Sequence, residues 1–233
     1  MKKKLGVIGG MGTEATNYFF EELVAHTKTE KDQDHLDTII LNHATLPDRT
    51  EAILSGNTEE LTSLLIKDAK LLEGIGIGNI AIPCNTAHYF YDTLQKETAI
   101  PIIHMIKESI SEALTRFGNV EKIGIMATTG TIETKIYHKE CEAQGVEVVV
   151  PSAARQADVM SLIYDEIKRG LPGDFNKFDR VYNELMATGS DVIILACTEL
   201  SVFKKRNKIY DNCLDALDIL VRESIQRSNA EYQ

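Results

Sequence analysis

Ile193-Ile194-Leu195-Ala196-Cys197 is a short apolar run that ends in a cysteine, and Ile80-Ala81-Ile82-Pro83-Cys84 has the same form 113 positions earlier (197 minus 84). Apolar runs of this length are typical of strands that are buried on both faces of a parallel sheet. Ligands of open α/β sheets bind at the carboxyl ends of the strands, where both cysteines stand. Because cysteine is scarce in this chain, the match predicts two equivalent strands that each present a thiol.

A second pair of matching segments opens the two halves of the chain. Leu5-Gly6-Val7-Ile8 corresponds to Ile123-Gly124-Ile125-Met126, which lies 118 positions later (123 minus 5). Gly12-Thr13 corresponds to Gly130-Thr131 at the same offset. A strand followed by glycine is common in α/β proteins, so this pair gains weight from the cysteine-ended pair. Together they indicate an internal repeat.

Helical stretches with one apolar face separate the strand candidates, a pattern typical of parallel sheets covered by helices. We therefore predict an α/β fold of two similar Rossmann-like lobes, each a mostly parallel sheet flanked by helices, related by pseudo-two-fold symmetry with the active site in the cleft between them. Residues 1–115 are expected to form the N-terminal lobe and 116–212 the C-terminal lobe, with a helix near 213–228 packing back on the first. The remaining strand candidates are Thr38–Leu41, Ile100–Ile102, Val146–Val149 and the weaker Lys208–Tyr210.

The composition of the 233 residues, 43% hydrophobic and 26% charged, is ordinary for a soluble globular protein. No apolar run approaches the roughly 18 residues that span a bilayer, and the N-terminus does not have the form of a secretory signal, so we expect a cytoplasmic protein that does not bind membranes. The net charge of -10 argues against a nucleic-acid partner. The four cysteines form no C-x-x-C pair and no Cys/His cluster, so neither a metal site nor a disulfide framework is expected.

Each matched cysteine stands where a strand gives way to a helix. Backbone N–H groups at a helix start favour negative charge, so this position is expected to lower the pKa of the Cys84 and Cys197 thiols. A lone cysteine is most often a small packing residue, but that explanation is weaker for a matched pair. Cys141 and Cys213 lie within helical patterns and are expected to be packing residues.

Two such thiols suit the inversion of a stereocentre by proton transfer. A thiolate removes the proton from one face of the carbon, a thiol returns one to the other face, and the roles exchange in the reverse reaction. Without a cofactor, the carbanion of an amino acid needs hydrogen-bond donors at its carboxylate, each worth on the order of 3 kcal/mol. The candidate donors at the strand-end turns are Asn85, Thr86, Thr128, Thr129, Thr131 and Thr198.

Three motifs resemble the aspartate/glutamate racemase superfamily, in its aspartate racemase branch. They are Gly6-Val7-Ile8-Gly9-Gly10-Met11-Gly12-Thr13-Glu14-Ala15-Thr16, Pro83-Cys84-Asn85-Thr86-Ala87-His88 and Ala196-Cys197-Thr198-Glu199-Leu200. The resemblance extends from Leu5 to about residue 225 and implies a cofactor-independent isomerase that interconverts L- and D-aspartate, with glutamate as a further substrate. It implies that Cys84 serves the D-enantiomer and Cys197 the L-enantiomer. The implied partners are a small acidic amino acid and a second copy of the chain in a homodimer.

The same resemblance implies how an acidic side chain is held. The family's substrate-binding arginine matches Arg49, and its substrate-binding lysine matches Lys168. A guanidinium and an ammonium suit a dicarboxylic amino acid, although Arg49 could instead be a solvated loop residue and Lys168 an ordinary helix end. Met11 and Glu199 complete the expected substrate-binding set. Glu199 either polarises Cys197 or accepts the substrate's ammonium group.

Departures from the family pattern bear on the substrate. Glutamate racemases proper carry an aspartate-bearing motif after the first strand and a histidine two residues past the second cysteine. Here those places hold Gly-Gly-Met-Gly and Glu199, which favours aspartate over glutamate without excluding a broad-specificity enzyme. Thr13 also stands where the family usually has proline.

Other classes fit these residues less well. Gly10-Met11-Gly12-Thr13-Glu14-Ala15 fits the G-x-G-x-x-A pattern of nicotinamide-dependent oxidoreductases, but the next strand ends in Leu41-Asn42-His43 and not in an acidic residue. Two further alternatives would retain the anion site: a carbanion enzyme of the maleate isomerase or decarboxylase type, and a non-catalytic amino-acid sensor. Loss of one cysteine would favour these alternatives, and this chain has both Cys84 and Cys197. Hydantoin racemases share the two-cysteine logic but act on neutral rings. A thiol-disulfide role lacks a nearby resolving cysteine.

Overall fold

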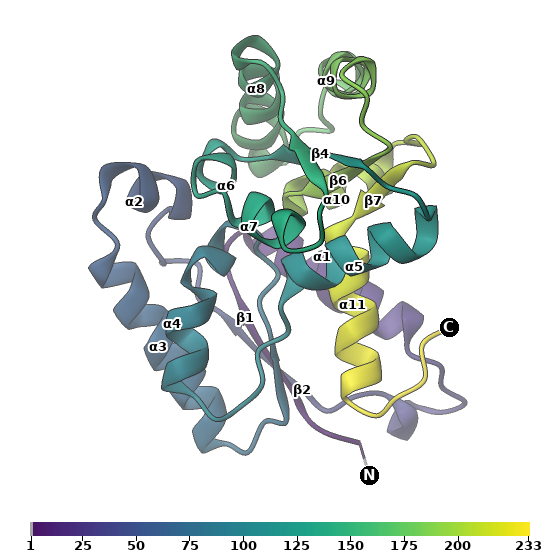
Figure 1. The fold of residues 1–233 in the computed structure, drawn as a ribbon. Helices are drawn as coiled ribbons and strands as arrows, with labels where there is room; N and C mark the ends of the chain where they lie inside the picture. Colours follow the sequence, from purple (N-terminus) through teal and green to yellow (C-terminus); the bar gives the residue numbers. More distant parts are fainter. Residues whose placement is uncertain (1) are drawn as a thin grey trace. The chain divides into compact units, whose positions relative to one another are not determined.

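The computed structural model describes residues 2–233, and the chain divides into two compact units. One unit is formed by Met1–Met105 with Leu217–Gln233, and the other by the continuous segment Ile106–Ala216. Each unit has its own parallel sheet with helices packed against it (Figure 1). The expected α/β class, with two helix-flanked parallel sheets, is therefore confirmed, while the lobe bounds at residues 115 and 212 stay a prediction.

The first unit combines the N-terminal part of the chain with its C-terminal helix. Its elements are β1 (Leu5–Gly9), α1 (Thr13–His26), the 3₁₀ turn η1 (Asp32–Asp34), β2 (Thr38–Asn42), α2 (Arg49–Ser55), α3 (Glu59–Gly74), β3 (Asn79–Ala81), the 3₁₀ turn η2 (Thr86–Phe90), α4 (Tyr91–Glu97) and most of α11 (Ala216–Arg227).

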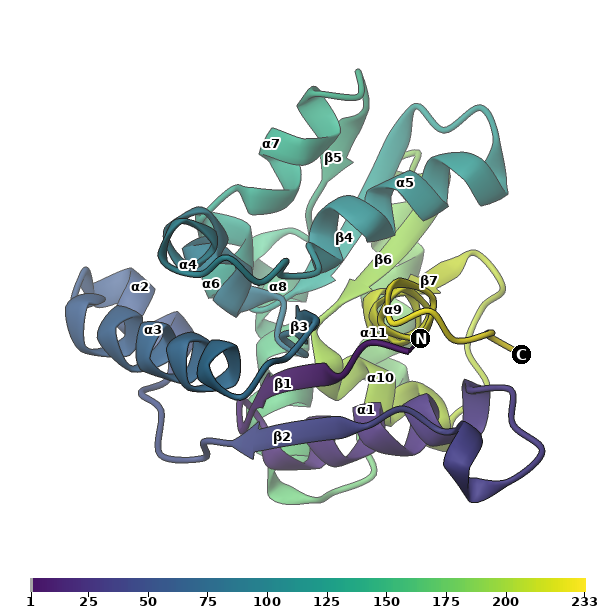
Figure 2. The same cartoon turned by 90° about the horizontal axis from the view of Figure 1, so that it is seen from below.

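The sheet of the first unit has the parallel order β2-β1-β3, and Figure 2 shows β1 and β2 side by side. β1 is buried along its whole length, as its uninterrupted apolar sequence predicts. A parallel bridge between Ile80 and Ile102 adds a fourth position beside β3. This isolated bridge is all that forms where the sequence predicted a strand over Ile100–Ile102. Because the strands are parallel, their carboxyl ends lie along one edge of the sheet.

The C-terminal segment closes against early parts of the first unit. The backbone N–H of Lys3 donates to the Ser228 carbonyl oxygen at 3.0 Å, and Asn79 Nδ2 donates to the Arg227 carbonyl oxygen at 2.9 Å. The yellow α11 and the purple β1 in Figure 1 therefore belong to one unit, although more than 200 residues of sequence separate Lys3 from Ser228.

The second unit contains the middle of the chain. Its elements are α5 (Met105–Phe117), β4 (Lys122–Ala127), α6 (Thr129–Glu133), α7 (Ile136–Glu142), β5 (Glu147–Val149), α8 (Ala153–Met160), the π-helical segment η3 (Ser161–Glu166), the 3₁₀ turn η4 (Ile167–Arg169), α9 (Phe175–Ala187), β6 (Val192–Ala196), α10 (Thr198–Arg206) and β7 (Cys213–Asp215).

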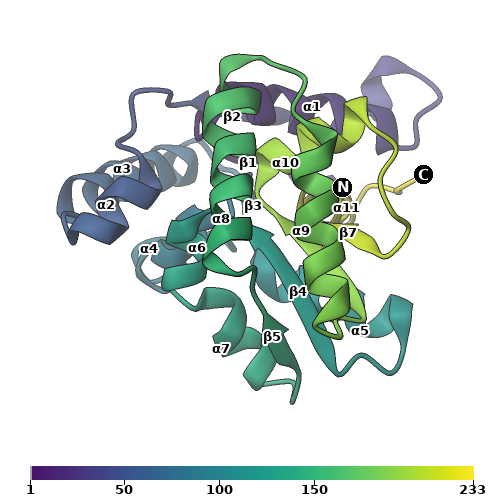
Figure 3. The ribbon, with the colours of Figure 1, turned by 90° about the horizontal axis from the view of Figure 1, so that it is seen from above.

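The sheet of the second unit has the parallel order β5-β4-β6-β7. This order matches that of the first unit once the Ile80–Ile102 bridge is counted: the opening strand is central, with the second strand on one side and the cysteine-ended strand on the other. The two sheets therefore share one strand order, in agreement with the internal repeat in the sequence. α8 and α9 lie side by side against β4 (Figure 3).

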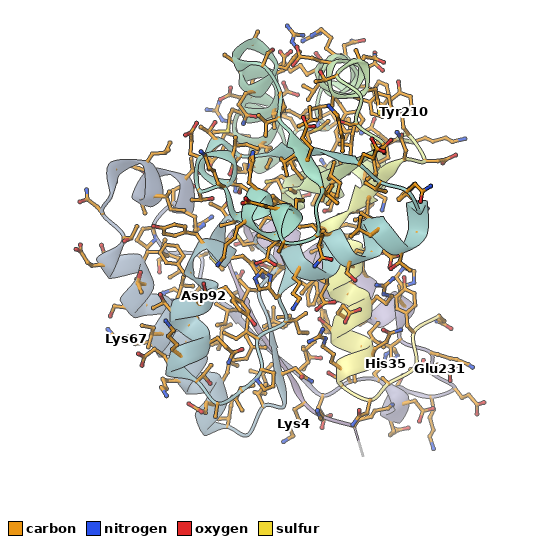
Figure 4. The ribbon with its side chains drawn as sticks, in the orientation of Figure 1. Lys4, His35, Lys67, Asp92, Tyr210 and Glu231 are labelled. Carbon is orange, nitrogen blue, oxygen red and sulfur yellow. The ribbon has the colours of Figure 1, made fainter. Side chains whose placement is uncertain are left out.

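The weakest strand prediction, Lys208–Tyr210, is wrong. That segment forms no strand, and the Tyr210 ring, labelled in Figure 4, instead stacks on Tyr182 of α9 with ring centroids 3.7 Å apart. The edge strand is β7, and it includes Cys213, which the sequence predicted to lie in a helix. The helix expected near 213–228 begins only at Ala216.

Over residues 2–233, no helix combines the length and the apolar character needed to cross a membrane. Within the same range, no cluster of three or more His, Cys, Asp or Glu side chains is arranged to hold a metal ion.

Candidate active site

The carboxyl ends of the two central strands of the second unit bring two predicted site residues together. β4 and β6 are neighbours, and Ala127 pairs with Ala196 at the last position of their register. Thr128 follows β4 directly, and Cys197 follows β6 directly. The carboxyl-end edge of the second sheet therefore carries a hydroxyl and a thiol that follow two adjacent strands.

Cys197 is the residue before α10 and is only 6% exposed. Its Sγ–H donates to Glu199 Oε2 at 2.9 Å. Burial, followed by the negative charge of Glu199, raises the pKa of the Cys197 thiol well above its usual value. The lowered pKa that the sequence predicted at this helix start is therefore wrong for Cys197, because desolvation and a neighbouring carboxylate outweigh the backbone N–H groups.

Lys168 is part of the same cluster. It lies on η4, and its Nζ is 2.5 Å from Glu199 Oε1, with the side chain 24% exposed. Its ammonium also lies over the Tyr164 ring, 5.4 Å from the centroid. Lys168 thus stands at a helix end, as the alternative had it, but it is ion-paired with Glu199 beside Cys197. Thr198 is buried at the first position of α10.

The threonines that follow β4 organise the start of α6. Thr128 is the N-cap: its Oγ1 accepts from the Thr131 backbone N–H at 3.3 Å, and the two hydroxyl oxygens are 3.2 Å apart. The backbone N–H of Thr129 donates to Met160 Sδ at 3.2 Å. The Thr128 hydroxyl thus caps this helix, as short polar side chains at helix starts commonly do, and the Thr131 hydroxyl lies against it.

Sequence reasoning missed Gln156 of α8, which lies against this turn. Its Nε2 donates to the Ala127 carbonyl oxygen at 2.9 Å and to Thr129 Oγ1 at 3.3 Å. Its Oε1 is buried and accepts no hydrogen bond from the described residues. No sequence signal marks Gln156, because it reads as one polar position of an amphipathic helix.

In the first unit, Cys84 lies three residues past β3 and is 7% exposed. A tight turn holds it there, since its backbone N–H donates to the Ile82 carbonyl oxygen at 2.8 Å. Asn85 and Thr86 are buried at the start of η2, a 3₁₀ turn that continues directly into α4. Met11 is also buried and belongs to the same hydrophobic cluster as Cys84.

His88 fixes the backbone on which Cys84 stands. His88 Nδ1 is 2.9 Å from the Cys84 carbonyl oxygen, and Nε2 accepts from the Met105 backbone N–H at 3.1 Å. Nε2 is therefore unprotonated and Nδ1 carries the hydrogen. Burial, followed by the neighbouring His104, lowers the pKa of His88 to about 4, so the ring is neutral at pH 7.

Arg49 is the first residue of α2 and is 8% exposed, so the alternative of a solvated loop arginine is wrong. Asp48 caps this helix by accepting from the Glu51 backbone N–H at 2.9 Å. Arg49 Nη1 donates to the Pro47 carbonyl oxygen at 3.0 Å, whereas its buried Nε has no acceptor among residues 2–233. α2 packs against η2, the turn that follows Cys84.

The glycine-rich turn after β1 depends on Gly10. Its φ is +87°, and a Cβ there would lie 2.4 Å from the carbonyl carbon of His43. The Gly10 N–H donates to Thr16 Oγ1 at 2.9 Å, which in turn donates to the Gly12 carbonyl oxygen at 2.8 Å. Glycine therefore lets this turn close against the end of β2 and place Met11 in the core.

The predicted site residues fall into two groups. The first unit contains Met11, Arg49, Cys84, Asn85 and Thr86. The second unit contains Thr128, Thr129, Thr131, Lys168, Cys197, Thr198 and Glu199.

Comparison with known proteins identifies a matching family. The family described as Asp/Glu/Hydantoin racemase matches residues 8–223. The chain is similar to the broad-specificity amino-acid racemase of Bacillus subtilis strain 168, with 26% identity over 201 residues, which are 84% of this chain and 86% of that protein.

Solved structures show the same likeness. The aspartate racemase of Picrophilus torridus is 29% identical, with a TM-score of 0.81 over 99% of this chain and 96% of that one. An aspartate racemase homologue from Pyrococcus horikoshii OT3 is 25% identical, with a TM-score of 0.77 over 97% of this chain and 99% of that one.

Proposed function

Because the chain belongs to the Asp/Glu/hydantoin racemase family, and is thus an isomerase of the racemase type, we propose that it interconverts L- and D-aspartate without a cofactor, using Cys84 and Cys197 as a two-base pair. One observation carries this proposal. In two sheets of the same strand order, the equivalent strand leads into a buried cysteine at a helix start.

In the proposed reaction, the two sulfurs act on opposite faces of one α-carbon. A thiolate takes the α-proton, leaving a carbanion whose charge spreads into the carboxylate, and the other thiol then protonates the opposite face. The reverse reaction exchanges the roles of the two sulfurs. Donors at the strand-end turns would stabilise the carboxylate as it gains enolate character. We assign this role to Asn85, Thr86, Thr128, Thr129, Thr131 and Thr198.

Arg49 is proposed to bind a substrate carboxylate. A buried guanidinium is costly unless an anion pairs with it, and Arg49 has no carboxylate partner among residues 2–233; its one hydrogen bond there goes to a backbone carbonyl. Lys168 and Glu199 are proposed to complete the charged part of the site, and Met11 to line it. An arginine and a lysine together suit a substrate with two carboxylates.

The likeness to an aspartate racemase over nearly the full length of both chains supports aspartate as the substrate. A second candidate is a broad-specificity amino-acid racemase that also accepts glutamate, favoured by the similarity to the Bacillus subtilis enzyme of that description. A homodimer and a cytoplasmic location stay predictions.

The test is incubation of the purified protein with each enantiomer of aspartate, glutamate and alanine, followed by chiral chromatography. We expect racemisation of aspartate, little of alanine, and loss of activity in both Cys84→Ala and Cys197→Ala. Cys141→Ala is the matched control, because Cys141 is also a buried cysteine but lies on α7.

Two results would contradict the proposal. Racemisation that persists in either cysteine variant would exclude the paired-thiol mechanism. Equal rates on alanine and aspartate would exclude recognition of a second carboxylate and favour broad specificity. Arg49→Ala tests substrate binding. We expect this variant to fold normally and to have a higher KM than the wild type.

A further inference from the structure

One carboxylate in the second unit joins a cation to a candidate catalytic thiol. Glu199 uses both of its oxygens: Oε1 is 2.5 Å from Lys168 Nζ, and Oε2 accepts from Cys197 Sγ at 2.9 Å. The three groups come from η4, the start of α10 and the residue after β6. No periodic pattern in the sequence connects them.

The contact between Glu199 and Cys197 requires a proton. An ionised carboxylate and a thiolate are both acceptors only, so they cannot form a hydrogen bond unless one of them is protonated. Carboxyl groups ionise near pH 4.3 and thiols near pH 8.5, so a single shared proton belongs on sulfur. Lys168 Nζ lies 2.5 Å from the other oxygen of Glu199, the contact expected between an ammonium and a carboxylate.

The surroundings of Cys197 both raise and lower the pKa of its thiol. Burial first, and then the Glu199 charge, raises the pKa of the Cys197 thiol, while Lys168 and the Glu199 backbone N–H oppose that rise. Tyr137 of α7 lies near Cys197 and also near Asp215 of β7. Burial raises the pKa of Tyr137 well above its usual value, so its hydroxyl is neutral and brings no charge.

Lys168 is held in place by the segment that precedes it. Glu166, at the end of the π-helical η3, accepts from the Asp174 backbone N–H at 2.6 Å and forms an ion pair with Lys177 of α9. Lys177 also donates to Ser161 Oγ at 3.0 Å. π-Helical segments occur frequently at functional sites, and this one fixes the turn that carries Lys168.

We propose that Glu199, held by Lys168, is a positioning residue that keeps the proton on Cys197 in the resting enzyme, so that Cys197 acts first as the acid and Cys84 as the base. This inference rests on the proposed function for its catalytic meaning, but the protonation of Cys197 can be measured without substrate. In the first turnover, the Cys84 thiolate takes the α-proton and becomes a thiol. The carbanion takes the proton of Cys197, which becomes a thiolate, and solvent exchange restores the resting form.

The bias has a kinetic signature that thermodynamics constrains. The equilibrium constant of racemisation is one, so kcat/KM must be equal for the two enantiomers. A resting proton on Cys197 therefore appears as a lower KM and a proportionally lower kcat for the enantiomer that Cys84 deprotonates. Glu199→Gln should bring the two KM values closer together.

The direct test is NMR of protein labelled with ¹³C at the cysteine β-carbons, titrated from about pH 6 to about pH 10, the range in which thiols ordinarily ionise. Signals are assigned with Cys84→Ala and Cys197→Ala. We expect Cys197 to stay a thiol at pH 8 in the wild type. In Glu199→Gln, we expect its ionised fraction at a given pH to rise by about tenfold or more, because Lys168 then acts on the sulfur alone.

Adding Lys168→Met to Glu199→Gln should reverse much of that rise, since the remaining positive charge is then lost. Opposite effects of two substitutions in one cluster distinguish an electrostatic role from a structural one. Glu147→Gln removes an exposed ion pair between β5 and Lys122 of β4; it is the matched control and should leave Cys197 unchanged.

A wild-type Cys197 that ionises below about pH 8 would overturn the inference, even if Glu199→Gln does not fold. So would an unchanged titration in a folded Glu199→Gln variant. If Cys197 behaves as expected but the protein racemises no amino acid, the proposed function fails and the protonation inference stands.

Discussion

Acidification should destabilise this protein through the neutral, buried His88, and replacing His88 should remove that part of the effect. His88 donates from Nδ1 to the Cys84 carbonyl oxygen and accepts at Nε2 from the Met105 N–H. Protonation would place a hydrogen on Nε2, where the Met105 N–H already points and where the Ile103 carbonyl oxygen, 3.4 Å away, offers only a long hydrogen bond in exchange. It would also put a charge in a site that is only 4% exposed.

The size of the effect follows from the two pKa values. The pKa of His88 is about 4 in the folded protein, against 6.5 for an unperturbed histidine. Because the folded-state value is the lower one, the unfolded chain takes up the proton first as the pH falls. The contribution is therefore fully present above pH 6.5 and is lost between pH 6.5 and about 4. Over that window it amounts to on the order of 3 kcal/mol of unfolding free energy.

Urea unfolding of wild type and His88→Gln at about pH 7 and about pH 4 measures this contribution. Carboxylates titrate in both proteins, so their effect cancels in the difference. We expect the wild type to lose on the order of 3 kcal/mol more than the variant. His35→Gln is the control, because the His35 ring makes no hydrogen bond to any residue from 2 to 233. Equal losses in wild type and His88→Gln, or an NMR titration of the His88 ring near pH 6.5, would refute the reasoning.

Two further predictions concern packing. Gly10→Ala should lower the unfolding free energy by at least about 2 kcal/mol more than Gly56→Ala. Both glycines have positive φ, but a Cβ at Gly10 would lie 2.4 Å from the His43 backbone, whereas Gly56 faces open space. Equal thermal midpoints for the two variants would contradict this prediction. Leu65→Ala, at a fully buried position, should cost about 2–5 kcal/mol in urea unfolding. Leu54→Ala, at a position 54% exposed, should change stability by less than about 0.5 kcal/mol, and similar costs for the two would contradict the packing described.

The sequence predicts the strands and the cysteine positions well because both depend on local pattern. Apolar runs such as those of β1 and β6 are buried on both faces, and this burial fixes their composition. β7 was missed because it is only three residues long and includes the buried Asp215. The Ser201 hydroxyl donates a hydrogen bond to Asp215 Oδ1 at 2.7 Å. An acidic residue in a short apolar segment does not read as a strand, since its partner lies elsewhere in the sequence.

The electrostatics of the candidate site could not be read from the sequence. The helix-start argument for Cys197 is sound locally, but burial and the Glu199 carboxylate reverse its sign. Lys168 is 31 positions from Glu199, and only the fold of η3 and η4 brings the two together. The helical position and burial of Arg49 could not be predicted, because its helix α2 has only seven residues, too few for a periodic pattern.

The closing of the C-terminal segment on the first unit has a consequence for the order of events during synthesis. The second unit is a single continuous segment, Ile106–Ala216, and a ribosome completes it before it makes Leu217–Gln233. The first unit, by contrast, is built from two segments that the whole second unit separates in the sequence. The part containing Cys84 can therefore complete its packing only after every residue of the second unit, Cys197 included, has been synthesised.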